Sequence, residues 1–191
     1  MTGQTIATAH WTALDRSGED KCRLARADHG WLLVGHARFQ DGDGFAALDY
    51  VVRCDKDWLT LGVDIAGLHG DRDIRIQIER TTDGWSLNET PQPGLDLALD
   101  IDLSFTPATN LMPLRRLLAG PVDALITRSA WLDYPATALR PLDQTYTRRA
   151  PGKVAYRGEQ TGYVTELSVD DSGFVTTYPR LWQGEVRHET P

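Results

Sequence analysis

The feature that most constrains this chain is a repeated alternation of apolar and polar residues between short turns. From residue 73 to residue 79, three isoleucines occupy every second position, and charged or amide side chains stand beside them. Because successive side chains of a β-strand point to opposite faces, this period of two predicts a strand with one wet face. The Asp83-Gly84 pair that follows suits a tight hairpin turn. Such a pattern predicts hairpins in an antiparallel sheet.

Two further segments alternate in the same way. Between residues 95 and 105 apolar side chains hold the odd positions, and aspartates that include Asp96, Asp100 and Asp102 stand between them. We expect these aspartates on the solvent-exposed face, because a slip of one residue would bury them. Residues 163–169 repeat the pattern. Together with the turn residues elsewhere, these segments predict about ten short strands.

Only the segment from Asn110 to Ala119 is typical of a helix. Pro113 falls in its first turn, where the missing N–H has no helical acceptor, and Gly120 suits the position after the last turn. We expect the side chain of Asn110 to cap this helix by accepting a bond from a free N–H group. The predicted fold class is therefore mainly β, with one short helix around residues 110–119.

Composition and charge are those of an ordinary globular chain. Of the 191 residues, 41% are hydrophobic and 25% charged, close to the average of soluble domains. The net charge of -7 would repel a phosphate backbone, so we expect no nucleic-acid partner.

No apolar run approaches the roughly 20 residues of a transmembrane helix, and residues 1–10 lack a secretory signal. We expect one domain over residues 1–191, located in the cytoplasm, and the oligomeric state is left open.

The motifs of common catalytic and cofactor sites are not found in the sequence. No serine lies in a G-x-S-x-G elbow, and neither phosphate-binding glycine motif is present. The two cysteines and five histidines lack the spacing of a zinc site, and we expect each histidine at the surface or in a loop. Six tryptophans could line a ligand pocket, although we expect about two in three in the core. No cofactor, metal or catalytic residue is predicted.

The segment from Asp100 to Leu117, DIDLSFTPATNLMPLRRL, resembles a signature of the bacterial family called putative glycolipid-binding proteins. That family shows a D-x-D-x-x-x-TP-x-TN-x-x-P-x-RRL-like pattern. Flanking residues agree over nearly the whole chain, from Trp11 to Pro179. Where the family usually has a Gly-Cys pair, this sequence has Ala98-Leu99, so no role of that cysteine carries over. The resemblance implies a spiral β-roll, which is a single curled antiparallel sheet, and its name implies a glycolipid ligand.

The signature contains the candidate binding residues Asp100, Asp102, Thr106, Thr109, Asn110, Arg115 and Arg116. Asp100 and Asp102 are two residues apart in a predicted strand, so their carboxylates share one face of the sheet. They could hold a divalent cation, act as an acid/base pair, or only form part of a solvated surface. The sequence leaves these alternatives open.

The other candidates also have a structural and a functional interpretation. The short side chains of Thr106, Thr109 and Asn110 could fix a turn, and that turn could also present backbone N–H groups to a ligand. Arg115 and Arg116 would point about 100° apart on a helix, so they would reach different partners. We expect one of them to pair with Asp100 or Asp102, and binding of an anionic head group is the alternative.

The function that these observations favour is non-enzymatic binding of a glycolipid or other amphiphile enclosed by the curled sheet. The helix at residues 110–119 would form a lid or rim. The expected apolar walls include Ile74, Ile76, Ile78, Leu97, Leu99 and Ile101. One alternative is a hydrolase or lyase using Asp100 or Asp102 with Arg115 or Arg116, and another is a protein-interaction module with a filled core.

The two cysteines give a first testable prediction. Because no export signal is recognised, we expect Cys22 and Cys54 to be unpaired in the cell. Thiol labelling of freshly lysed protein, unfolded without reductant, should modify both residues. Finding neither residue labelled would contradict this expectation.

Overall fold

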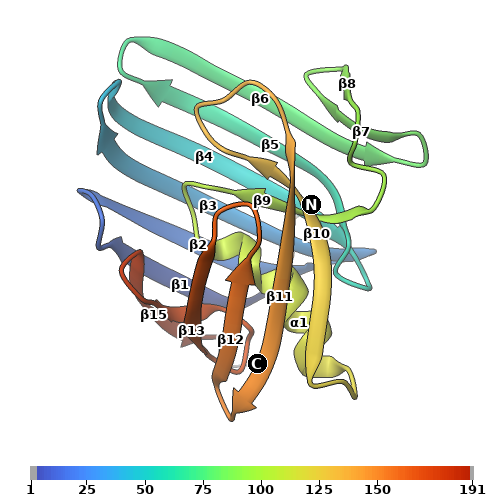
Figure 1. Ribbon diagram of the computed structural model, residues 1–191. Helices are drawn as coiled ribbons and strands as arrows, with labels where there is room; N and C mark the ends of the chain where they lie inside the picture. The colour runs from blue at the N-terminus through green and yellow to red at the C-terminus, as the bar shows by residue number, and fades with distance from the viewer. Residues whose placement is uncertain (1–3, 190–191) are drawn as a thin grey trace.

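The computed structural model describes residues 4–189 and places fifteen β-strands in one curled sheet around a short helix (Figure 1). The elements are β1 (Gln4–Ala13), β2 (Gly18–Ala27), β3 (Gly30–Asp41), β4 (Gly44–Asp55), β5 (Thr60–His69), β6 (Arg72–Thr81), β7 (Gly84–Leu87), β8 (Thr90–Gln92), β9 (Ala98–Leu103), the 3-10 turn η1 (Ala108–Asn110), α1 (Leu111–Ala119), β10 (Ala124–Leu132), β11 (Arg140–Ala150), β12 (Lys153–Gly158), β13 (Tyr163–Val169), β14 (Val175–Tyr178) and β15 (Trp182–His188). The strand order is β8-β7-β6-β5-β4-β3-β2-β1-β15-β14-β13-β12-β11-β10-β9.

The predicted fold class is confirmed. The sheet is antiparallel throughout except for β9, which runs parallel to β10. The helix α1 lies within the predicted segment and has nine residues. No helix of residues 4–189 is long and apolar enough to cross a membrane. Fifteen strands exceed the roughly ten predicted, because strands such as β8, with three residues, are too short to show an alternation.

The first and last strands of the chain meet in the middle of the sheet. β1 pairs with β15, for example at Trp11 and Gly184, so the hydrogen-bonded sheet continues across both ends of the chain. The two edges of the sheet are then β8 and β9, which follow one another in the sequence. Figure 1 shows the sheet curling so that β9 passes inside the roll instead of closing a barrel with β8.

Side chains satisfy the free edge of β9 inside the roll. Buried backbone groups at a sheet edge need partners, since each unpaired group costs about as much as a lost hydrogen bond. The N–H of Ile101 donates to the hydroxyl of Thr60 on β5 at 3.0 Å, and the N–H of Leu103 donates to Thr109 at 3.3 Å. The Trp85 indole donates to the carbonyl of Ala98 at 3.1 Å. The bonds with Thr60 and Trp85 attach the edge of the sheet to the inside of its other half, and the bond with Thr109 attaches it to η1.

The helix α1 lies between the two halves of the sheet and fills the space between them (Figure 1). Arg148 on β11 donates to the carbonyls of Leu117 and Gly120 and so satisfies the end of the helix. The interior-facing side chains of α1 are fully or almost fully buried, and they are Leu111, Met112, Leu114 and Leu117. The helix is therefore an internal plug, and the expectation of a lid or rim is wrong.

The orientation predicted for residues 95–105 is confirmed in part, since Leu95, Ile101, Leu103 and Phe105 are buried and Asp96 is exposed, but it is wrong in the middle of the segment. Leu97 is 72% exposed, whereas Asp100 is fully buried. Ile101 is buried as well, so at residues 100–101 both faces of β9 are covered by protein. Of the expected apolar walls, Leu97 and Leu99 therefore face solvent, while Ile78 and Ile101 belong to the core and Ile74 and Ile76 pack against it.

Other expectations about single residue types are mostly confirmed. Cys22 and Cys54 are free and buried. Four of the six tryptophans are buried, namely Trp11, Trp58, Trp85 and Trp182. The exception concerns His69, which is fully buried instead of lying at the surface. Its ring nitrogens lie 2.8 Å from a carboxylate oxygen of Asp41 and 3.0 Å from the hydroxyl of Tyr134, and these polar partners permit its burial.

The attachment of β9 leads to a prediction about Thr60. The substitution Thr60→Val keeps the shape of the side chain but leaves the buried N–H of Ile101 without its acceptor, which should lower the free energy of unfolding by about 1–3 kcal/mol. Chemical denaturation measures this change. Thr12→Val, at an exposed position on β1, is the matched control. Equal stabilities of the two variants would show that the hydroxyl of Thr60 does not hold the edge.

Candidate functional site

An ion pair inside the roll holds the signature segment. The guanidinium of Arg116 on α1 donates two bonds to the carboxylate of Asp100 on β9, at 2.7 and 2.6 Å. Thr127 donates to the same carboxylate at 3.0 Å, and Arg116 also donates to the carbonyl of Trp58 at 3.0 Å. Side-chain exposure is 1% for Asp100 and 17% for Arg116. The predicted pairing of an arginine with one of the two aspartates is thus confirmed for Arg116 and Asp100.

The polar residues between β9 and α1 mainly fix the turn. The hydroxyl of Thr106 accepts the N–H of Ala108 at 3.0 Å and donates to the buried carboxylate of Asp20 on β2. This turn is thereby tied to the other half of the sheet. The structural interpretation of Thr106 as a residue that fixes a turn is confirmed.

Asn110 does not cap α1 through its side chain, so that prediction is wrong. The 3-10 turn η1 runs directly into the helix and already supplies carbonyl acceptors to the N–H groups of Asn110 and Leu111. The Asn110 amide instead donates to the carbonyl of Pro107 at 3.2 Å and accepts the hydroxyl of Tyr146 at 2.9 Å. It joins the turn to β11.

Arg115 and Arg116 reach different partners, as their separation on the helix predicts. The guanidinium of Arg115 lies 5.0 Å from the ring centre of Trp58, a distance suited to a cation–π contact. It also donates to the carbonyls of Asp171 and Ser172, both at 3.4 Å. Arg115 therefore connects the helix to the turn that precedes β14.

Asp102 has surroundings unlike those of Asp100. One of its carboxylate oxygens, Oδ2, accepts the side-chain amide of Gln144 at 3.0 Å, and the same amide donates to the hydroxyl of Tyr156 at 3.1 Å. Burial raises the pKa of Asp102 to about 6, and the negative charge of Asp100 adds to this shift, while the bond from Gln144 opposes it. No cationic side chain of residues 4–189 forms an ion pair with Asp102.

Asp102 lines a pocket of about 180 Å³ with an aromatic wall. Along the inner face of β10 to β15, side chains from different strands converge because the sheet curls. Tyr178 lies at the centre of the row, with its ring centre 5.7 Å from that of Tyr156 and 5.6 Å from that of Tyr163. We call this site the aromatic pocket, and it is defined by Asp102, Trp131, Tyr156, Tyr163, Tyr178 and Trp182.

The structure divides the seven predicted site residues into two groups. Asp102, Thr106 and Asn110 line the aromatic pocket. The pocket lining does not include Thr109, whose hydroxyl accepts a backbone bond, or Asp100, Arg115 and Arg116, whose partners are described above. Sequence reasoning missed the aromatic wall, although the alternation over residues 163–169 predicted the strand that carries Tyr163.

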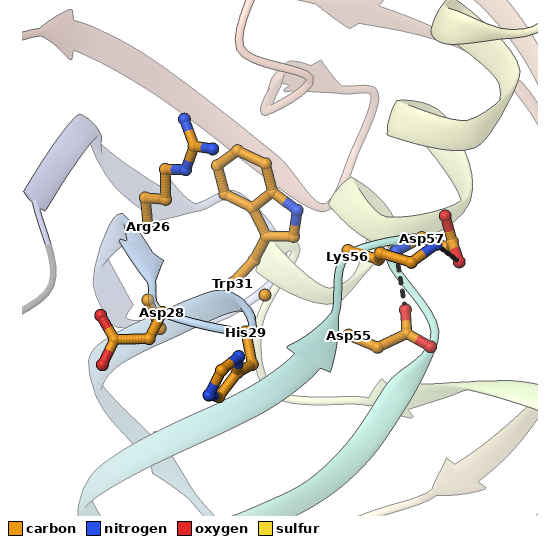
Figure 2. Close-up of a pocket in the computed structure, with 9 residues that line it drawn as sticks. Arg26, Asp28, His29, Trp31, Asp55, Lys56 and Asp57 are labelled. Atoms are coloured by element: carbon orange, nitrogen blue, oxygen red, sulfur yellow. Dashed lines mark hydrogen bonds and ion pairs between the residues drawn. The ribbon is translucent and has the colours of Figure 1, made fainter.

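A second depression, of about 570 Å³, lies between the β2–β3 and β4–β5 turns (Figure 2). Its wall includes Trp31, which stacks on Trp58 at 4.3 Å between ring centres. The carboxylate of Asp55 accepts the N–H groups of Asp57 and Leu59, both at 2.9 Å, so it stabilises its own turn. This depression is larger than the aromatic pocket, but the contacts found for Asp55 and Trp31 are structural ones.

The fold and the pocket define a class of protein in which an unclosed, rolled β-sheet surrounds a short helix and presents a pocket on its inner face. The chain belongs to the family described as Putative glycolipid-binding, whose model matches residues 8–184. The crystal structure of a DUF1089 family protein from Pseudomonas aeruginosa is similar, with a TM-score of 0.73 and 27% sequence identity. The similarity covers 86% of this chain and 91% of that one. No curated protein matches the chain.

The ion pair leads to a prediction about stability. Arg116→Met would leave the carboxylate of Asp100 buried without its counter-charge, which should lower the free energy of unfolding by about 3–5 kcal/mol. Arg72→Met is the control, because Arg72 pairs with Asp43 at the surface, where a salt bridge contributes only about 0–1 kcal/mol. Urea denaturation measures both. Adding Asp100→Asn to Arg116→Met should recover part of the loss, and the absence of any recovery would contradict this account.

Proposed function

We propose that this protein binds the polar head group of a glycolipid or similar amphiphile in the aromatic pocket, without chemical conversion. The observation that carries the proposal is the pocket itself, in which five aromatic rings surround the polar groups of Asp102, Thr106 and Asn110. The family description supports a glycolipid as the class of ligand.

The chemistry of the wall suits a sugar. A sugar ring has apolar C–H faces and a rim of hydroxyl groups, so it needs flat apolar surfaces together with hydrogen-bonding groups. Trp131 and Trp182 supply large aromatic surfaces, and tyrosines supply both a ring and a hydroxyl. The carboxylate of Asp102 is an acceptor for sugar hydroxyls.

The size of the pocket assigns it to the head group. A volume of about 180 Å³ is below the roughly 300–1,000 Å³ of typical pockets for drug-sized ligands. An acyl tail would therefore extend past the pocket.

The arrangement of carboxylates favours binding over the hydrolase or lyase considered as an alternative. A two-carboxylate mechanism needs both groups free to act on the substrate. Here the oxygens of Asp100 are held by Arg116 and Thr127. Asp102 is the one carboxylic acid among the described residues that line the pocket.

Binding of an alkyl glycoside tests the proposal. Titration calorimetry with n-octyl glucoside, kept below its micelle concentration, should show saturable binding to the wild type. Trp131→Ala removes one aromatic wall and should weaken binding about tenfold. Trp31→Ala is a closely matched control, because both tryptophans are partly exposed and lie near an arginine, while Trp31 is outside the pocket. Absence of saturable binding by the wild type would refute the proposal.

A further inference from the structure

The charges around the aromatic pocket do not balance. Asp102 is its one carboxylic acid, and no lysine, arginine or histidine is among the described residues that line it. Asp100, two residues away, is neutralised by Arg116. Oδ2 of Asp102 accepts only the neutral amide of Gln144, and within residues 4–189 its Oδ1 has no hydrogen-bond partner. The pocket thus presents a carboxylate that no cationic side chain compensates.

The aromatic side chains of the pocket also favour a cationic ligand. The face of an aromatic ring carries partial negative charge and attracts cations within about 6 Å of its centre. Three arginines lie near rings of the wall, since Arg140 is 5.1 Å from the ring centre of Trp131, Arg180 is 5.2 Å from that of Tyr163 and Arg16 is 6.0 Å from that of Trp182, but none of the three lines the pocket. Inside the pocket the rings and the carboxylate favour the same kind of group, which is a compact cation that can donate hydrogen bonds.

We infer that the head group bound in the aromatic pocket carries a protonated amine, as an amino sugar does, and that this ammonium group lies against Asp102. The inference rests on the proposed function and specifies its ligand. An ammonium group has three donors, so it can bind Oδ1 of Asp102 and a nearby tyrosine hydroxyl while its charge faces the rings. A neutral sugar hydroxyl in the same place could donate a bond but would bring no charge.

The titration of Asp102 gives the inference a signature in pH. With its pKa raised to about 6, the carboxylate is mostly ionised at pH 7 and mostly protonated at pH 5. Burial raises the pKa values of the neighbouring Tyr156 and Tyr178 above the usual value of a tyrosine, so neither changes its charge between pH 5 and pH 7. An amine that stays protonated from pH 7 to pH 5 should therefore lose its advantage as the pH falls.

A matched pair of ligands tests the inference. We would compare n-octyl glucoside with its 2-amino-2-deoxy analogue, which has the same tail and ring, by titration calorimetry at pH 7 and pH 5. The ammonium adds an attraction between opposite charges that the hydroxyl lacks, so the amine should bind about tenfold more tightly at pH 7. At pH 5 most of this preference should disappear. Asp102→Asn should remove it at both pH values, whereas Asp96→Asn, at an exposed position, should keep it.

The outcomes separate this inference from the proposed function. If the wild type binds both ligands equally at pH 7, the amine inference is overturned and the glycolipid proposal stands. If it binds neither, the proposed function fails and the inference fails with it. A preference that persists in Asp102→Asn would overturn the role of the carboxylate. If that variant does not fold, the pH dependence of the wild type decides, because a preference unchanged at pH 5 would refute the inference.

Discussion

The buried pair of Asp100 and Arg116 is the interaction on which the roll depends. A charged carboxylate inside a protein is stable only with a partner, and here the partner lies on the helix that fills the roll. Thr127 on β10 and the carbonyl of Trp58 before β5 bind the same two side chains. One polar cluster therefore joins the edge strand, the helix and both halves of the sheet. This explains how the sheet can end inside itself rather than at the surface.

The local pattern of the chain was sufficient to predict most strands and the helix, because period and turn residues act over a few positions. It failed in the middle of residues 95–105, where the alternation placed Asp100 in water. The partners that allow Asp100 to be buried, Arg116 and Thr127, lie 16 and 27 positions further along the chain. Nothing in the strand itself encodes them. The parallel pairing of β9 and β10 could not be predicted from the two strands either. It is set by the connection through α1, which returns the chain in the same direction.

The candidate site was predictable only in part. Asp102, Thr106 and Asn110 belong to the signature segment and do line the pocket. The aromatic wall comes from separate strands, β10 and β12 to β15, whose side chains meet because the sheet curls. A strand pattern can show that Tyr163 faces inward, but it cannot show which other rings it will meet. The curvature of the sheet, and not any one motif, assembles this wall.

Asp20 and Asp102 both have a raised pKa, but their surroundings differ. Burial raises the pKa of Asp20, like that of Asp102, to about 6. Asp20 is fully enclosed, and it accepts the hydroxyl of Tyr50 at 2.8 Å and that of Thr106. These two bonds offset part of the cost of burying the carboxylate, and the bond from Thr106 links β2 to the turn that carries Thr106. Asp102 is only partly buried and lines the pocket, where a ligand can reach it. Thr106 and Asp102 line the same pocket, whereas Asp20 does not. By binding Thr106, Asp20 helps to hold the wall of the pocket in which Asp102 lies.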